Sequence, residues 1–324
     1  MTKAIRFETP GGSDVLQFVD IDLPAPAAGQ VRIRHTAIGV NFIDTYHRTG
    51  LYPLPMPSGL GSEAAGVVEA VGEGVTRFKA GDRVGYGSGF IGSYSEAANV
   101  PADRLVKLPE GVSDEVAAAS LLKGMTAQYL LRRTFKVEKG QTILVHAAAG
   151  GVGQILCQWA NYLGATVIGT VGSADKAKIA RENGCHHTIL YRDEDFVARV
   201  NEITKGAKCD VVYDGVGKAT FPASLDCIRP MGMFVSYGNA SGAIEAFNIL
   251  LLLTKGSLFA TRPTLVHYGA KREDVLMMAK EVMDVVGKGV VKIPVNQTYA
   301  LKDAAQAHRD LEARKTTGST VLLP

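Results

Sequence analysis

Residues 142–153 read TILVHAAAGGVG, an apolar and partly β-branched run followed by a cluster of small residues. Such a run suits a buried parallel strand, and the residues from Gln154 onward have helical periodicity. A strand, a tight glycine turn and a helix together bind a pyrophosphate, because the helix N-terminus presents unpaired N–H groups and the positive end of its dipole. The stretch therefore predicts a dinucleotide-binding turn.

The glycines of this turn have separate predicted tasks. We expect Gly150 to permit a sharp turn, Gly151 to let a phosphate approach the backbone, and Gly153 to let the helix pack close to the strand. Val152 is a further candidate for cofactor binding. Ala148 occupies the position at which the usual pattern has its first glycine. Because a loose glycine pattern is equally compatible with a plain tight turn, the neighbouring segments decide the interpretation.

Segments with strand composition alternate with helical segments from Thr142 to Thr261. This alternation implies right-handed crossovers and a doubly wound parallel sheet, and so an α/β Rossmann domain. The strands are expected at 142–147, 165–171, 187–191, 210–214, 232–237 and 257–261, and the helices at 154–163, 174–183, 194–205 and 219–228.

The first 120 residues have a different pattern. Short strand candidates, at 30–35 and 65–71, alternate with turns rich in glycine and proline, which predicts a β-rich, barrel-like domain. A helix from Ser113 to Leu122, capped by Ser113, leads into the Rossmann part. After Thr261 we expect a helix at 273–286, a strand near Tyr299, a helix at 304–313 and a last strand. Because this segment no longer continues the alternation, we expect it to fold back onto the first domain.

Composition excludes several classes of protein. The 35 basic and 32 acidic residues are nearly balanced, and no block of Lys and Arg marks a nucleic-acid groove. The cysteines, at 157, 185, 209 and 227, form no CxxC pair, which favours buried thiols in a cytoplasmic protein. We see no targeting signal and no apolar run long enough for a membrane span.

Motifs along most of the chain resemble the medium-chain dehydrogenase/reductase superfamily. They include Gly39–Asp44, Gly61–Gly66 and Lys79–Val84. Within it, Asn41–Tyr46, Arg48–Pro53, His146–Gly153 and Val235–Asn239 resemble the zinc-free quinone oxidoreductase, or ζ-crystallin-like, branch. The resemblance implies a GroES-like catalytic domain at 1–124, an NADP-binding Rossmann domain at 125–264 and a C-terminal segment, 265–324, that completes the catalytic domain. It also implies a homodimer.

Metal ligands are missing where the zinc enzymes of this superfamily have them. In the matching frame, those enzymes use a cysteine, a histidine and another cysteine, and this chain has Asn41, Ser62 and Leu122. Tetrahedral Zn²⁺ prefers thiolate, imidazole or carboxylate ligands. Glu63 and Asp44 remain, but two carboxylates alone make a poor substitute. We expect no metal.

The choice of dinucleotide depends on the end of the second Rossmann strand. NAD enzymes usually carry an acidic residue there, which bonds the ribose hydroxyl. Here Gly172 and Ser173 leave room for a phosphate, and Lys176 can supply charge, although it could also lie on a solvated helix face. We therefore expect NADPH. The resemblance implies further cofactor contacts from Thr126, Tyr129, Tyr191, Asn239, Ser241 and Arg314.

With a nicotinamide and no metal, the simplest chemistry is direct hydride transfer to an electron-poor acceptor in the cleft between the domains. Candidate hydrogen-bond donors, in segments that the resemblance brings to this cleft, are Asn41, Tyr46, Tyr52, Lys123 and Arg262. An NADPH:quinone reductase is the leading hypothesis. A reductase of α,β-unsaturated carbonyls fits the same residues, and a role as an RNA-binding or crystallin-like structural protein is the alternative of another class.

Overall fold

The computed structural model describes residues 1–324, and the chain divides into two compact units. Unit 1 comprises residues 1–125, 269–287 and 293–324, and unit 2 comprises residues 126–268 and 288–292. The helix α2 (Asp114–Tyr129) contains the boundary between residues 125 and 126. The expected domain limits at 124 and 264 stay a prediction.

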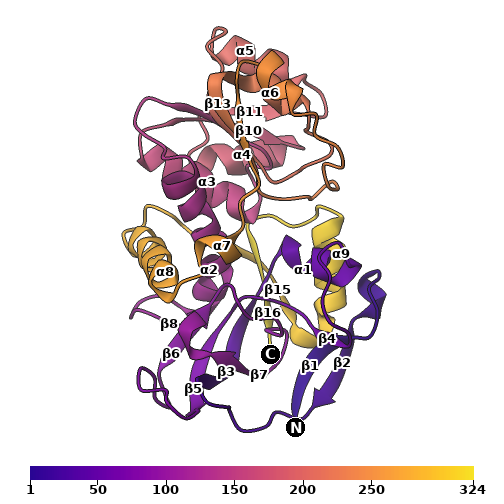
Figure 1. Ribbon diagram of the computed structural model, residues 1–324, viewed down its shortest axis with the longest axis vertical. Coiled ribbons are helices and arrows are strands. Elements are labelled where there is room, and N and C mark those ends of the chain that lie inside the picture. The colour runs from indigo at the N-terminus through magenta and orange to yellow at the C-terminus, as the bar shows by residue number, and fades with distance from the viewer. The chain divides into compact units, whose positions relative to one another are not determined.

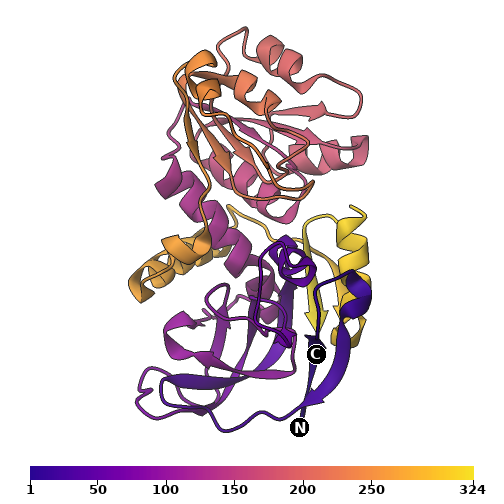
Figure 2. The same ribbon diagram turned by 45° about the vertical axis from the view of Figure 1, so that its right-hand side comes forward.

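Unit 2 contains a six-stranded parallel sheet with the strand order β11-β10-β9-β12-β13-β14 (Figures 1 and 2). Counted along the unit, this is the order 3-2-1-4-5-6 of a doubly wound dinucleotide-binding fold. The predicted Rossmann architecture is confirmed, and each predicted strand corresponds to an observed one. The strands are β9 (Thr142–Val145), β10 (Thr166–Val171), β11 (His187–Leu190), β12 (Cys209–Asp214), β13 (Ile228–Ser236) and β14 (Phe259–Thr261).

Three predicted helices of unit 2 are present, and one is wrong. They are α3 (Gly151–Tyr162), α4 (Ala174–Glu182) and α5 (Phe196–Ile203), whereas the helix expected at 219–228 is a turn followed by the 3₁₀ helix Ala223–Cys227. Pro222 directly precedes this short helix and lacks the N–H that an α-helix would need there. Two short helices, α6 (Leu250–Thr254) and α7 (Leu265–Tyr268), were not expected.

Unit 1 is built on two sheets. A three-stranded sheet has the order β2-β1-β4, and a seven-stranded sheet has the order β15-β16-β3-β5-β6-β8, with β7 paired to β3. The strands are β1 (Thr2–Phe7), β2 (Gln17–Ile21), β3 (Gln30–Val40), β4 (Ser58–Gly59), β5 (Ala64–Val71), β6 (Arg83–Tyr86), β7 (Ala97–Pro101), β8 (Val106–Lys107), β15 (Val295–Ala300) and β16 (Ser319–Leu323). Because β16 pairs antiparallel with β3, the expectation that the C-terminal segment folds back onto the first domain is confirmed.

The helices of unit 1 frame this sheet. Ser113 caps α2 as predicted, its hydroxyl accepting the N–H of Val116 at 3.2 Å, but the helix runs on to Tyr129 instead of ending at Leu122. The predicted C-terminal helices are α8 (Arg272–Gly287) and α9 (Ala304–Glu312). The helix α1 (Phe42–Thr49) was not expected, because at eight residues it is shorter than the window over which helical periodicity is recognised.

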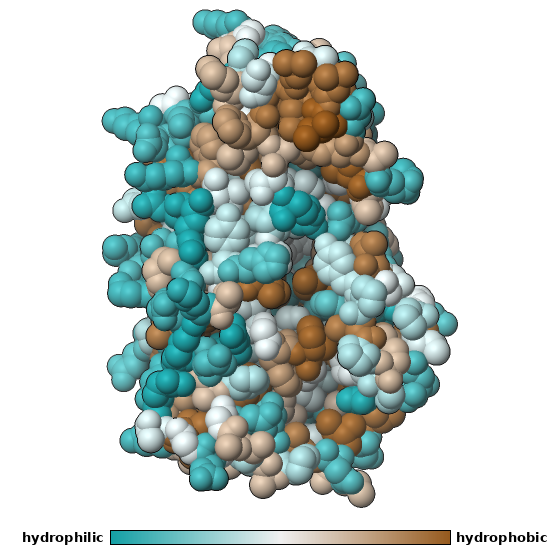
Figure 3. Space-filling model, in the orientation of Figure 1, coloured by the Kyte–Doolittle hydropathy of each residue, from teal (hydrophilic) through white to brown (hydrophobic).

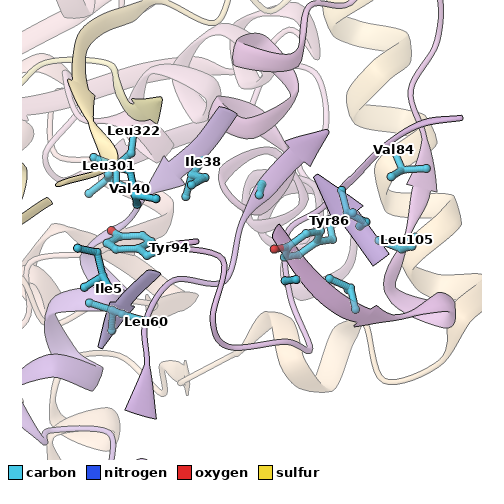
Figure 4. Close-up of a cluster of buried hydrophobic side chains, with 14 of the residues drawn as sticks. Ile5, Ile38, Val40, Leu60, Val84, Tyr86, Tyr94, Leu105, Leu301 and Leu322 are labelled. Atoms are coloured by element: carbon cyan, nitrogen blue, oxygen red, sulfur yellow. The ribbon is translucent and has the colours of Figure 1, made fainter. Parts of the chain in front are cut away.

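Each unit has its own apolar core. In unit 1, side chains from the two sheets meet those of the C-terminal segment, as Leu301 and Leu322 show beside Ile38 and Val40 (Figure 4). In unit 2, Leu144, Ile168 and Val212 of adjacent strands form the centre of a second cluster. None of the helices combines the length and the hydropathy that a membrane crossing requires.

Candidate functional site

The glycine turn of unit 2 follows the carboxyl end of β9, with its sharpest backbone conformation at Ala147. Ala147 has φ of 54°, in the left-handed region that favours glycine, whereas Gly150 has an extended backbone that any residue adopts. The expectation that Gly150 makes the sharp turn is therefore wrong, since Ala147 makes it. Gly150 is instead the N-cap of α3.

Gly153 is required by close packing, as predicted. A Cβ atom added there would lie 2.3 Å from the carbonyl oxygen of Ala147, a distance that no side chain tolerates. The helix α3 begins at Gly151, so Gly151, Val152 and Gly153 form its first turn and their N–H groups have no intrahelical acceptors. This first turn offers an anion three backbone donors.

Gly172 and Tyr191 meet beside the end of β10. A Cβ atom on Gly172 would lie 2.9 Å from the Tyr191 hydroxyl oxygen, so the two predicted phosphate contacts are brought together. Ser173 is the N-cap of α4, and its hydroxyl accepts the N–H of Lys176 at 3.4 Å. Lys176 thus lies in the first turn of α4, half-buried.

The loop after β13 is tied to the loop after β12. The Ser241 hydroxyl donates to the carbonyl oxygen of Val216 at 2.8 Å and accepts the N–H of Ala219 at 2.9 Å. A Cβ atom on Gly217 would lie 3.4 Å from the Cα atom of Asn239. Both predicted residues therefore lie at the carboxyl edge of the sheet, where open α/β sheets bind ligands.

The remaining predicted cofactor residues are spread over both units. Thr126 is buried in α2, and Tyr129 stacks on Tyr268 with ring centroids 4.5 Å apart. Arg314 is an exposed residue of unit 1 that follows α9. The roles of these three residues in cofactor binding stay predictions.

In unit 1, three segments converge on the carboxylate of Glu63, which is fully buried. Its Oε2 atom accepts the Asn41 Nδ2–H at 2.8 Å and the Lys123 Nζ–H at 3.3 Å, and its Oε1 atom accepts the N–H of Leu122 at 2.7 Å. Asn41 follows β3, Glu63 precedes β5, and Lys123 lies within α2. The structure thus brings together two predicted donors, Asn41 and Lys123.

A second buried chain of hydrogen bonds begins at Asp44, three residues after Asn41. The Tyr94 hydroxyl donates to Asp44 Oδ2 at 2.9 Å, and the Asn41 N–H donates to the same oxygen at 2.8 Å. His308 Nε2 lies 3.1 Å from the Tyr94 hydroxyl oxygen, and Arg48 Nη1 donates to His308 Nδ1 at 3.0 Å. Arg48 also makes a bidentate ion pair with Glu312.

These contacts assign the proton of neutral His308. Since Arg48 can only donate, Nδ1 of His308 accepts and Nε2 carries the hydrogen, which points to Tyr94. Burial and the Arg48 charge lower the pKa of His308 to about 3. Burial raises the pKa of Asp44 to about 7, although the hydrogen bonds from Asn41 and Tyr94 act in the opposite direction. The donors in this chain of hydrogen bonds therefore point from Arg48 toward Asp44.

The other predicted donors form two separate groups. Tyr46 and Tyr52 pack edge to face, with ring centroids 5.3 Å apart, and the Tyr52 N–H donates to the Tyr46 carbonyl oxygen. Arg262 belongs to unit 2, where it is exposed after β14. Only the two tyrosines of this set are shown to contact each other.

Comparison with known proteins decides the family. Residues 27–110 match the model described as "Alcohol dehydrogenase GroES-like domain", and residues 151–274 match "Zinc-binding dehydrogenase". A quinone oxidoreductase of Pseudomonas aeruginosa is 54% identical over 100% of both chains. The crystal structure of Escherichia coli quinone oxidoreductase complexed with NADPH superposes with a TM-score of 0.98, at 50% identity, over 99% of this chain and 100% of that one. The chain belongs to the quinone oxidoreductase branch of the medium-chain dehydrogenase/reductase superfamily.

A relative with another name lies almost as near. A 2-haloacrylate reductase of a Burkholderia species is 48% identical over 100% of this chain and 99% of its own. Quinone oxidoreductases and a reductase of a conjugated acid therefore share this fold at similar identity.

Membership of this branch allows the groups around Glu63 to be compared with the metal ligands of the superfamily's zinc enzymes. Of the three positions that the resemblance matches to metal ligands of the zinc enzymes, Asn41 and Leu122 donate to Glu63, and Ser62 directly precedes it. No three His, Cys, Asp or Glu side chains are arranged so that they could hold a metal ion. Hydrogen-bond donors and one carboxylate stand where a metal centre would need thiolate and imidazole.

Sequence reasoning missed most of these partners. It considered Glu63 only as a weak metal ligand, although a glutamate directly before the apolar run Ala64–Val68 is a signal of a buried carboxylate. It missed Tyr94, His308 and Glu312 altogether. These residues meet Asp44 or Arg48 only through tertiary contacts, so no local pattern marks them.

Proposed function

We propose that this protein is an NADPH-dependent quinone reductase that transfers hydride to a quinone without zinc. The observation that carries the proposal is the buried arrangement in unit 1 in which the Glu63 carboxylate holds the Asn41 amide and the Lys123 ammonium. An amide and an ammonium stabilise a developing oxyanion by hydrogen bonds, and a quinone needs no stronger activation.

The residues of unit 2 fit a dinucleotide phosphate. The first turn of α3 presents three N–H groups, and two of its residues, Gly151 and Gly153, have no side chain. Gly172, Ser173, Lys176 and Tyr191 would hold the 2′-phosphate, because Gly172 has no side chain, the Tyr191 hydroxyl lies beside it and no acidic side chain lies at the end of β10. When bound, NADPH supplies the hydride.

The absence of zinc in the mechanism follows from the donor types. Asn41, Ser62 and Leu122 offer an amide, a hydroxyl and an aliphatic chain, and the Asn41 amide is already bonded to Glu63. We expect purified protein to contain no stoichiometric zinc and to keep its activity in chelator. Loss of activity in EDTA that added Zn²⁺ restores would contradict the proposal.

Steady-state kinetics with matched acceptor panels test the function itself. NADPH oxidation is followed with a series of quinones and, in parallel, with a series of enones and 2-haloacrylate. Turnover of quinones that exceeds turnover of enones supports the proposal. The 2-haloacrylate reductase relative favours a second candidate, an NADPH-dependent reductase of α,β-unsaturated carbonyls, and the reverse preference would establish it.

Tyr52 tests the acceptor side. We propose that Tyr52 and Tyr46 line the acceptor pocket, so Tyr52→Phe should lower quinone turnover several-fold and leave the NADPH dissociation constant within about twofold. Tyr162→Phe, an exposed tyrosine on α3, is the control. Unchanged quinone kinetics would mean that Tyr52 only packs against Tyr46.

We also propose a homodimer in the cytoplasm. The strand β14 is the outermost strand of its sheet, and apolar side chains are exposed on and near it, as Figure 3 shows over α6. They include Phe259, Ile249 and Leu253, exposed by 59%, 76% and 66%. An unpaired apolar edge favours pairing with a second copy. Light scattering should give twice the mass of one chain, and Phe259→Lys should give the monomer.

The four free, buried cysteines support the cytoplasm as the location, because it is a reducing compartment.

A further inference from the structure

Glu63 combines complete burial with three hydrogen-bond donors, one from Asn41 and two from neighbouring residues of α2. Its side chain is 0% exposed, and that of Lys123 is 7% exposed. A carboxylate in such surroundings is costly unless its charge is paired and its oxygens are bonded. Here both conditions are met, because the Lys123 ammonium lies 3.3 Å from Oε2 and both oxygens accept hydrogen bonds.

The backbone is shaped around this carboxylate. Glu63 and Gly39 face each other across β3 and β5, where the Gly39 N–H donates to the Glu63 carbonyl oxygen at 3.0 Å. A Cβ atom on Gly39 would lie 2.3 Å from Glu63 Oε2 and 2.1 Å from the carbonyl oxygen of Ala118. Only glycine at position 39 leaves room for the carboxylate, so its place is fixed by sterics as well as by hydrogen bonds.

The two oxygens of Glu63 have different partners. Oε1 bonds only the backbone N–H of Leu122, which joins the start of β5 to α2. Oε2 bonds the side chains of Asn41 and Lys123. Asn41 has two amide hydrogens and Lys123 has three ammonium hydrogens, so each keeps N–H groups that are not bonded to Glu63.

We infer that Glu63 is a positioning residue for hydride transfer: through Oε2 it orients the Asn41 amide and the Lys123 ammonium so that their remaining N–H groups bind the acceptor oxygen. The inference rests on the proposed function, since it needs Asn41 and Lys123 on the acceptor side. It adds that one buried carboxylate does the orienting that a metal ion does in other enzymes of this superfamily. Two donors fixed in advance lose little freedom when charge develops on the acceptor oxygen.

The test is a set of variants on the full-length enzyme: Glu63→Gln, Lys123→Met and the two combined. Glu69→Gln on β5, the strand that follows Glu63, is the control, because Glu69 forms only an exposed ion pair with Arg34. For each variant the number of folded sites comes from NADPH titration, and kcat with a quinone is expressed per folded site. The NADPH dissociation constant and Tm are recorded in parallel.

We expect E63Q to lower kcat by about tenfold while the NADPH dissociation constant stays within about twofold. In the K123M background the same change should cost only about threefold, because one of the two donors that Glu63 orients is already gone. E69Q should match the wild type. A purely structural Glu63 would lower Tm and the yield of folded sites, with kcat per site unchanged, and that result would overturn the inference. Equal losses in both backgrounds would overturn it too.

If E63Q alone does not fold, the double variant E63Q/K123M is compared with K123M instead, because the double variant leaves no buried charge unpaired. A further loss of about threefold relative to K123M then supports the inference, and equal kcat contradicts it. If the wild type shows no NADPH-dependent turnover of quinones or enones, the proposed function fails, whereas a fully active E63Q would refute the inference alone.

Discussion

The two candidate binding regions use different chemical groups, backbone groups in unit 2 and side chains in unit 1. In unit 2, backbone groups make the dinucleotide turn: the first-turn N–H groups of α3 and the close contact of Gly153 with Ala147. In unit 1, side chains from distant segments make the cluster, with Glu63 accepting from Asn41 and Lys123, and Arg48 reaching Glu312 across 264 residues of sequence. The turn depends on a few adjacent residues, and the cluster depends on the whole fold of its unit.

This difference predicts where single substitutions act. A change in the turn of unit 2 should alter binding of the dinucleotide before it alters the fold. A change in the buried cluster of unit 1 should alter stability, because removing one partner leaves others buried and unsatisfied.

The largest effect is expected at Arg48. Its guanidinium, with the side chain only 2% exposed, bonds Glu312 twice, His308 Nδ1 and the carbonyl oxygen of Gly11. Arg48→Met should lower the free energy of unfolding by about 3 kcal/mol, the lower end for a broken buried ion pair, since Glu312 can still be hydrated. Chemical denaturation measures the change.

The control for this substitution is Arg34→Met. Arg34 pairs with Glu69 at 3.1 Å, but both side chains are exposed, so the loss should be below about 1 kcal/mol. Similar losses at the two positions would show that the buried bonds of Arg48 contribute no more to the free energy of unfolding than the exposed ion pair of Arg34.

The next effect is expected in the turn of unit 2. Gly153→Val would push a side chain against the carbonyl oxygen of Ala147 and displace the first turn of α3. We expect the NADPH dissociation constant to rise about a hundredfold, equivalent to ~2.7 kcal/mol, as titrated by protein fluorescence. Gly287→Val, where no atom lies within 4 Å of the added Cβ, is the control. Normal NADPH affinity in Gly153→Val would refute the phosphate site.

The contrast between the units also explains what could be predicted from the sequence. The glycine turn, the six Rossmann strands and the return of β16 were accessible, because strand periodicity and turn residues are local signals. The donors Asn41 and Lys123 came from the family resemblance. Glu63 as their common partner could not be predicted, since it requires the register in which Gly39 faces Glu63 across β3 and β5.

Errors of local structure have equally physical causes. The left-handed conformation falls on Ala147 and not on a glycine, because the hydrogen bond from the Ala148 N–H to the Thr170 carbonyl oxygen holds the chain at that point. The chain from Asp44 to Glu312 joins α1 to α9, so its members share no sequence pattern. Tertiary contacts determine both features.

Cofactor choice should show a smaller effect at Lys176. If its ammonium binds the 2′-phosphate, Lys176→Ala should weaken NADPH binding by about 1–3 kcal/mol and leave NADH binding nearly unchanged. Lys178→Ala is a matched control on the same helix, because the Lys178 side chain is exposed and its Nζ atom lies 4.0 Å from Oε1 of Glu182, in an exposed ion pair. Isothermal titration with both dinucleotides measures the change. Equal losses for NADPH and NADH would assign Lys176 a structural role.

The smallest effect concerns the pH dependence of stability in unit 1. The pKa of His308 falls from 6.5 to about 3 on folding, so between these values the unfolded chain binds a proton that the folded chain does not. The contribution of His308 to stability is therefore lost as the pH falls below about 6.5, with a slope of at most ~1.4 kcal/mol per pH unit. Asp44 acts in the opposite direction, because its raised pKa of about 7 keeps it protonated in the folded state above its ordinary value of 3.8.

His308→Gln separates these two contributions. A glutamine can still accept from Arg48 and donate to Tyr94, but it does not titrate. Between pH 6.5 and 4 the variant should lose less unfolding free energy than the wild type, by up to about 1 kcal/mol per pH unit, as urea denaturation at a series of pH values measures. His267→Gln, at an exposed position of unit 2, should follow the wild type. If His308→Gln had the same slope as the wild type, His308 would take up its proton in the folded protein as readily as in the unfolded chain. The hydrogen-bond direction from Arg48 toward Asp44 would then be wrong.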